Sequence, residues 1–167
     1  MLHPAQSKVV ALSVSAGEAL QQGSVLRFTA MPDGSGRLQA FKAASGSAAF
    51  NFGTFVAYYI TPDSEDVEYV GAPESATFTL NTDTGVGGGI NTIASGVEFV
   101  ALGGSKTALI RFDKYSLHGT PATLPAPSTV LRYNSTSGLL SDGAFDTEVN
   151  AGLVVQNDIA SCVVLLG

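Results

Sequence analysis

The side chains best suited to catalysis are few in this chain. The two histidines are His3 and His118, and Cys162 is the only cysteine. His118, Asp113 and one of the many serines would suit a hydrolase, in which a histidine base activates a serine nucleophile. However, the Gly-x-Ser-x-Gly turn that presents the serine in common hydrolases follows none of the expected strands. We therefore expect no enzymatic activity and keep a hydrolase only as a third hypothesis.

Several other patterns match ligand sites only in part. Gly85–Ile90 lacks the third glycine of a dinucleotide-binding loop, and Gly103–Thr107 lacks the final glycine of a phosphate-binding loop. Asn81–Gly85 resembles the start of a calcium loop, but no acidic residue closes it at the usual distance. Glu65 and Asp66 are neighbours, so on a strand they point to opposite faces and do not form a glycosidase pair. The sequence thus predicts no cofactor and no metal.

The composition limits the kinds of partner. The chain has 167 residues, of which 45% are hydrophobic and only 13% charged, with a net charge of −6. Its eight lysines and arginines are scattered, which argues against direct nucleic-acid binding. No apolar run approaches the ~18 residues of a membrane span. With so few charges, the exterior consists of small polar and apolar residues or is covered partly by another chain.

The single cysteine excludes an intrachain disulfide and favours synthesis in a reducing cytoplasm. The apolar run Val9–Val14 is at the short end of the ~7–15 residues of a signal peptide. We expect that no leader is removed and that both ends of the chain, Met1 and Gly167, are held in place by the fold.

The elements that must position any site are short strands. Apolar and β-branched segments recur between Gly, Pro, Asn, Asp and Ser, which predicts one all-β domain over residues 1–167, a β-sandwich or a small β-barrel-like domain with extended loops or arms. Little helix is expected, at most a turn or two near Asp142–Asn150. The expected strands are Val9–Val14, Val25–Ala30, Leu38–Lys42, Phe50–Ile60, Val67–Val70, Ala76–Leu80, Val97–Leu102, Ala108–Phe112, Val130–Tyr133, Gly152–Val155 and Cys162–Leu166.

Two segments look like excursions from the sheets. Thr82–Gly96 contains five glycines, so we expect a loop without one fixed conformation of its own. Pro121–Pro127 has three prolines and favours an extended, polyproline-like path. The aromatic run Phe50–Tyr59 fits a core strand better than a sugar-binding face, although its tyrosines are also suited to an interface.

The first part of the chain carries a recognisable pattern. "AGEALQQG", Ala16–Gly23, leads into an apolar strand, then the hairpin signal Asp33-Gly34, then a strand ending in Lys42-Ala43, and the chain closes with "CVVLLG". We expect Gly17 and Gly23 to be turn positions and the residues between them a polar connection. This pattern resembles the head decoration, or capsid cement, proteins of tailed bacteriophages. The resemblance covers about the first 45 residues and the last ten.

The resemblance implies a structural virion protein, made in the host cytoplasm, that binds the outer surface of the capsid. It would bridge neighbouring major capsid subunits and act as a homotrimer or a dimer. The alternative is a carbohydrate-binding or receptor-binding β-sandwich module of a phage tail or fibre, which would use Tyr58, Tyr59 and Tyr69. The candidate interface residues are apolar and aromatic side chains on the expected arms and tyrosine run: Leu2, Pro4, Tyr58, Tyr59, Val86, Ile90, Pro121, Leu124 and Pro125.

Overall fold

The fold is all-β, as predicted. The computed structural model describes residues 8–43, 53–58, 78–80, 92–143 and 150–167. In these residues the only helical element is the 3-10 turn η3, Lys114–Ser116. No helix among them is long and apolar enough to cross a membrane. The strands are β1 Val10–Ala16, β2 Leu20–Gln21, β3 Leu26–Ala30, β4 Leu38–Lys42, β5 Thr54–Tyr58, β6 Phe78–Leu80, β7 Thr92–Ile93, β8 Glu98–Gly104, β9 Leu109–Asp113, β10 Val130–Tyr133, β11 Leu140–Ser141, β12 Gly152–Asn157 and β13 Ser161–Leu166.

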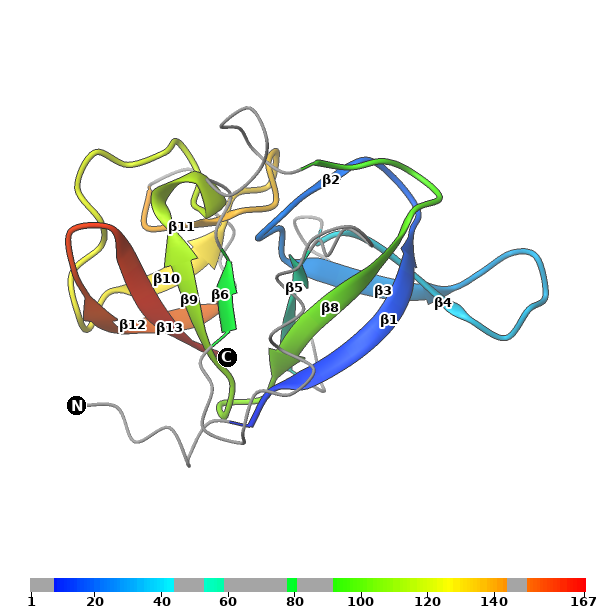
Figure 1. Cartoon of the computed structure of the whole chain (residues 1–167), viewed down its shortest axis with the longest axis horizontal. Helices are drawn as coiled ribbons and strands as arrows, with labels where there is room; N and C mark the ends of the chain where they lie inside the picture. The colour runs from blue at the N-terminus through cyan, green and yellow to red at the C-terminus, as the bar shows by residue number, and fades with distance from the viewer. Residues whose placement is uncertain (1–7, 44–52, 59–77, 81–91, 144–149) are drawn as a thin grey trace.

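The first sheet has the strand order β3-β4-β1-β8-β5 and is barrel-like (Figure 1). The β1–β4 pair is parallel and its other pairs are antiparallel. The chain just before β3 also bonds to β5: the N–H of Gly23 donates to Ala57 O (2.8 Å), and the N–H of Ala57 donates to Ser24 O (2.9 Å). This contact brings the two ends of the sheet together, so the sheet curls around its own apolar face.

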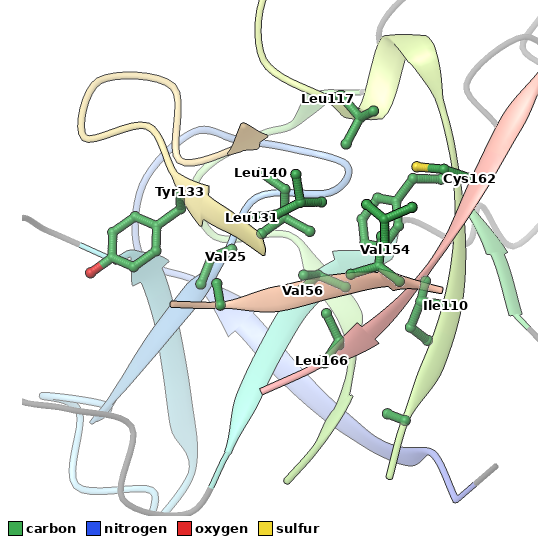
Figure 2. Close-up of a cluster of buried hydrophobic side chains, with 14 of the residues drawn as sticks. Val25, Val56, Ile110, Leu117, Leu131, Tyr133, Leu140, Val154, Cys162 and Leu166 are labelled. Carbon is green, nitrogen blue, oxygen red and sulfur yellow. The ribbon is translucent and has the colours of Figure 1, made fainter. Parts of the chain in front are cut away.

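The second sheet has the order β11-β10-β12-β13-β9-β6, in which β6 runs parallel to β9 and the other pairs are antiparallel. Alternate residues of β13 point inward, and Cys162, Val164 and Leu166 are fully buried. They pack with Val25 and Val56 of the first sheet in one hydrophobic cluster (Figure 2). The two sheets therefore share a core, in which a fully buried Val or Leu side chain contributes roughly 1.5–3 kcal/mol.

Strands β5 and β8 are buried on both faces, which explains their continuous apolar sequences. In β5, Phe55 and Ala57 point into a second cluster inside the barrel-like sheet, whereas Val56 points into the cluster shared with the second sheet. In β8, Ala101 points into the cluster inside the barrel-like sheet, and Leu102 points into the cluster shared with the second sheet. These two strands connect the two hydrophobic clusters.

The polar connection predicted between Gly17 and Gly23 is wrong. Leu20–Gln21 form β2, which pairs with β7, and Leu20 and Ile93 are buried in the cluster of the first sheet. Two residues are too few to show a strand period, so the signal was missed. The end of the predicted Gly-rich loop is therefore ordered as well, and the N–H of Gly96 donates to Ala16 O (2.7 Å). Residues 82–91 of that loop lie outside the described part.

Gly23 is a turn position, as predicted, and Gly17 lies in a bend directly after β1. Gly23 has φ +92°, and a Cβ there would lie 2.7 Å from Ser116 O. A Cβ at Gly17 would meet the ring of Phe41, so that ring would have to move. The predicted hairpin turn at Asp33-Gly34 is also present, between β3 and β4, and Gly34 has φ +74°.

The remaining predicted elements divide into three groups. The strand expected over Val67–Val70, most of the helical turn expected near Asp142–Asn150 and the N-terminus lie outside the described residues. The strand expected over Phe50–Ile60 is described as Thr54–Tyr58, and β11 was not predicted. The expected ordering of the C-terminus is confirmed: Gly167 O accepts from Thr54 N (3.0 Å), and Gly167 N donates to Ala151 O (2.8 Å).

Candidate protein-interaction surface

The structure describes only part of the predicted interface. Tyr58 is half-buried and packs against the cluster shared by the two sheets. Its ring is therefore partly a core group, which leaves less of it for a sugar or a partner. The other calls in the N-terminal, tyrosine and Gly-rich segments lie outside the described residues and stay predictions: Leu2, Pro4, Tyr59, Val86 and Ile90.

The Pro-rich segment 121–127 lies against the second sheet. Leu124 is 8% exposed and belongs to the shared cluster, and Pro125 is also buried. Asn157 Nδ2 donates to Pro125 O (3.2 Å), and the N–H of Ser128 donates to Val154 O (2.8 Å), so the segment follows the edge of β12. We therefore remove Leu124 and Pro125 from the candidate interface, because their side chains face the protein.

The outward side of this segment remains available to a partner. Pro121 is half-buried, and the exposed positions are Ala122, Thr123, Ala126 and Pro127. No Lys, Arg, Asp or Glu occurs between His118 and Leu131. The backbone is held by its prolines and by its contacts to β12, so this surface is neutral and ordered before any partner binds.

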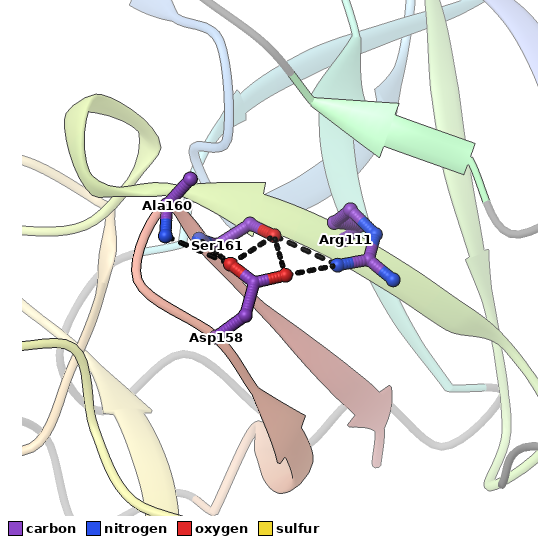
Figure 3. A network of polar contacts seen from close by, with 4 residues as sticks. All are labelled: Arg111, Asp158, Ala160 and Ser161. Atoms are coloured by element: carbon purple, nitrogen blue, oxygen red, sulfur yellow. Dashed lines mark hydrogen bonds and ion pairs between the residues drawn. The ribbon is translucent and has the colours of Figure 1, made fainter.

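The turn of the neighbouring β12–β13 hairpin is held by a polar network (Figure 3). Asp158 Oδ1 accepts from the N–H of Ala160 and of Ser161, both at 2.8 Å. Arg111 Nη1, from β9, donates to Ser161 Oγ (2.8 Å) and to Asp158 Oδ2 (3.2 Å). The two backbone N–H groups are the main reason why the pKa of Asp158 lies below its ordinary value. The carboxylate thus stays charged and fixes the turn.

The residue at the tip of this turn is Ile159, whose side chain is fully exposed (103%). Asn157, two residues earlier, contacts the Pro-rich segment, so turn and segment lie together at one end of the molecule, opposite the β3–β4 hairpin (Figure 1). We call the turn 158–160 and the segment 121–127 together the Ile159 end. Ile159 was not among the predicted interface residues, because a short turn between two strands is normally a polar position.

A second apolar area lies on the outer face of the second sheet. Val130 of β10 and Leu153 of β12 are direct cross-strand neighbours and are 47% and 37% exposed. Leu165 of β13, the next residue in register, is half-buried. The signal was present in the sequence, because Val130 and Leu131 are adjacent and only one of them can face the core.

The residues considered for hydrolysis have local structural contacts. Asp113 Oδ1 accepts from the N–H groups of Tyr115 (3.0 Å) and Ser116 (2.9 Å) and so caps η3. His118 Nδ1 lies 2.9 Å from Ser137 Oγ at the surface.

Within the described residues, no group of three or more His, Cys, Asp or Glu side chains is placed to hold a metal ion. Asn81–Gly85, Glu65 and Asp66 lie outside them.

Cys162 is buried within the shared cluster. Burial raises the pKa of its thiol to about 11, because a thiolate there would lose its hydration. A thiol that remains protonated at neutral pH is a poor nucleophile, so this residue acts as a small core side chain.

Comparisons with known proteins give one distant match. No protein-family model matches the chain, and no curated protein is similar to it. Among solved structures, the chain is similar to the "head fiber gp8.5 N base in bacteriophage phi29", with 10% sequence identity and a TM-score of 0.42. The match covers 96% of this chain and 95% of that chain. Identity and TM-score at this level assign neither a family nor a function.

Proposed function

We propose that this chain is a structural protein of a tailed-bacteriophage virion, a capsid cement protein without enzymatic activity. It binds the outer surface of the capsid and bridges neighbouring major capsid subunits, so that their separation requires breaking additional contacts. The partners in this proposal are the major capsid protein and further copies of the same chain, as a homotrimer or a dimer. No nucleic acid and no membrane take part.

The observation that carries this proposal is the Ile159 end. A structural binder needs a surface that is ordered in advance and able to lose its water at low cost. The Ile159 end has both properties: its turn is fixed by Asp158 and Arg111, and the outward side of residues 121–127 carries no charge.

The segments that resemble decoration proteins also fold in a way that suits the proposal. The hairpin signal at Asp33-Gly34 connects β3 and β4, and the closing segment "CVVLLG" forms most of β13. Val25, from the first of these segments, and Leu166, from the last, meet in the shared cluster. The two ends of the chain that carry the resemblance thus form one core, which supports treating them as parts of one pattern.

A stability assay on the virus particle tests the proposal. Particles of the phage that encodes the chain are prepared with and without the protein, heated in steps, and scored for DNA release with a DNA-binding dye. We expect particles without the protein to release DNA at a lower temperature, and added purified protein to restore the original temperature. Equal release temperatures, or an absence of the protein from purified particles, would contradict the proposal.

A further inference from the structure

Ile159 differs from the other large exposed apolar side chains of the described residues. It is fully exposed (103%), whereas the four others are between 37% and 48% exposed. Those four lie on strands and are partly covered by their neighbours on the sheet: Val10, Leu38, Val130 and Leu153. Ile159 alone among them stands on a turn and can enter a concave surface.

The turn is held by hydrogen bonds within the chain itself. Its backbone is fixed by the two N–H groups that donate to Asp158, and Asp158 in turn is held by Arg111 (Figure 3). Isoleucine is β-branched and has few rotamers to lose. Binding normally costs free energy because it orders a loop and its side chains. This cost is small here, because folding has already ordered the turn.

The charges around Ile159 define what it can contact. Asp158, the residue before Ile159, is 3.2 Å from the guanidinium of Arg111, so the two opposite charges are paired within the chain. The adjoining segment 121–127 is uncharged. A partner surface that matches this end is uncharged and apolar as well, with a recess the size of a branched aliphatic side chain.

From these observations we propose that Ile159 is the anchor of the capsid contact, and that it inserts into an apolar pocket on the outer surface of the capsid protein. The inference rests on the proposed function and adds to it the point of contact and the chemistry of the partner. Residues with this role are buried near the centre of an interface, where a few side chains account for most of the binding energy.

Binding to particles tests the role of the side chain. Particles of the encoding phage that lack the protein are mixed with purified wild-type or variant protein, sedimented, and the bound fraction is measured. Ile159→Asp is expected to weaken binding by roughly tenfold or more. The variant loses the free energy gained by burying the isoleucine, and it places a carboxylate in an apolar pocket. Ile159→Val is expected to keep most of the affinity. The matched control is Leu38→Asp, an exposed leucine on β4 at the other end of the molecule, which is expected to bind normally.

Chemical labelling gives a second measurement on a folded protein. Cys162 is buried and its pKa is raised to about 11, so Ile159→Cys introduces the one reactive thiol at neutral pH. We expect a maleimide to label this cysteine rapidly in the free protein and at least about tenfold more slowly on the particle. The unchanged protein, which should remain unlabelled, is the control.

The outcomes separate the two proposals. If wild-type protein does not bind particles, both the proposed function and this inference are wrong. If wild-type binds and Ile159→Asp binds equally well, or if residue 159 is labelled equally fast on the particle, only the inference is wrong. Equal losses in Ile159→Asp and Leu38→Asp would also overturn it, because the contact would then not be specific to this turn. Should Ile159→Asp fail to fold, the labelling result decides.

Discussion

The β3–β4 and β12–β13 hairpins are built by the same local device and end in different chemistry. In each turn an aspartate accepts backbone N–H groups: Asp33 from Ser35 (2.9 Å), and Asp158 from Ala160 and Ser161. Each hairpin is also tied to another strand of its own sheet through an ion pair, Arg37 with Glu98 of β8 in one and Asp158 with Arg111 of β9 in the other.

The difference is at the tips. The first turn contains Gly34 and Gly36 at positive φ and has a polar tip, whereas the second presents Ile159. Ile159 is fully exposed, and its turn is held by bonds from Asp158 and Arg111, so the isoleucine side chain takes no part in holding the turn. We therefore expect changes to the network to affect stability and changes at Ile159 to affect binding.

The largest effect on the free energy of unfolding is expected at the bases of the two hairpins. The two hairpins are alike there, because each base carries a fully buried leucine. Leu26 in β3 and Leu166 in β13 are both fully buried. Leu26→Ala and Leu166→Ala are each expected to lower the free energy of unfolding by about 2–5 kcal/mol, through lost burial and the cavity that remains. Chemical denaturation with urea measures this. A cost below about 1 kcal/mol for either variant would mean that its cluster is not a rigid core.

The next effect is expected at the aspartates, and here the hairpins differ. Asp158→Ala removes an acceptor for two backbone N–H groups and the partner of Arg111, whereas Asp33→Ala removes a smaller set of contacts. We expect Asp158→Ala to lower the melting temperature more than Asp33→Ala, and Asp158→Asn, which keeps one oxygen acceptor, to lie between wild type and Asp158→Ala. The reverse order in thermal melting would contradict the assigned role of the network.

A smaller effect is expected with pH. The pKa values of Asp33 and Asp158 are both below the ordinary 3.8, the first mainly through its hydrogen bonds to Ser35 and the second through the N–H groups of Ala160 and Ser161. The folded state therefore binds protons less readily than the unfolded chain, so this stabilisation is present above pH 3.8 and is lost as the pH falls further through the folded pKa values. Asp158→Asn is expected to weaken the acid dependence of urea unfolding below pH 3.8. An unchanged slope would contradict the depressed pKa.

The smallest effect on stability is expected at two exposed apolar side chains, Ile159 at the tip of the β12–β13 turn and Leu38 at the start of β4. Ile159→Asp and Leu38→Asp alter exposed side chains and should change the free energy of unfolding by no more than about 0.5 kcal/mol. Parallel urea curves for the two variants and wild type check this. A large loss of stability in Ile159→Asp would show that the isoleucine has a structural role and would break the distinction between turn and tip.

The fold was predictable where the signal is local. Alternating apolar residues indicated most of the longer strands, and Asp33-Gly34 indicated a hairpin. The candidate surface was predictable only in part. Leu124 and Pro125 of the predicted Pro-rich arm were expected to face outward and are buried instead, because an extended segment without a strand partner has no period that reveals which side chains face inward.

By itself, the sequence determined the all-β class, the turn at Gly23 and the resemblance at both ends of the chain, because these depend on neighbouring residues and on backbone sterics. Only the tertiary structure decided that Leu20 and Ile93 pair and are buried, that Leu124 faces the core, and that Ile159 stands free beside the Pro-rich segment. The physical reason is that burial depends on contacts between residues far apart in the chain. Strand pairing and sheet packing create those contacts, and no local pattern of residues records them.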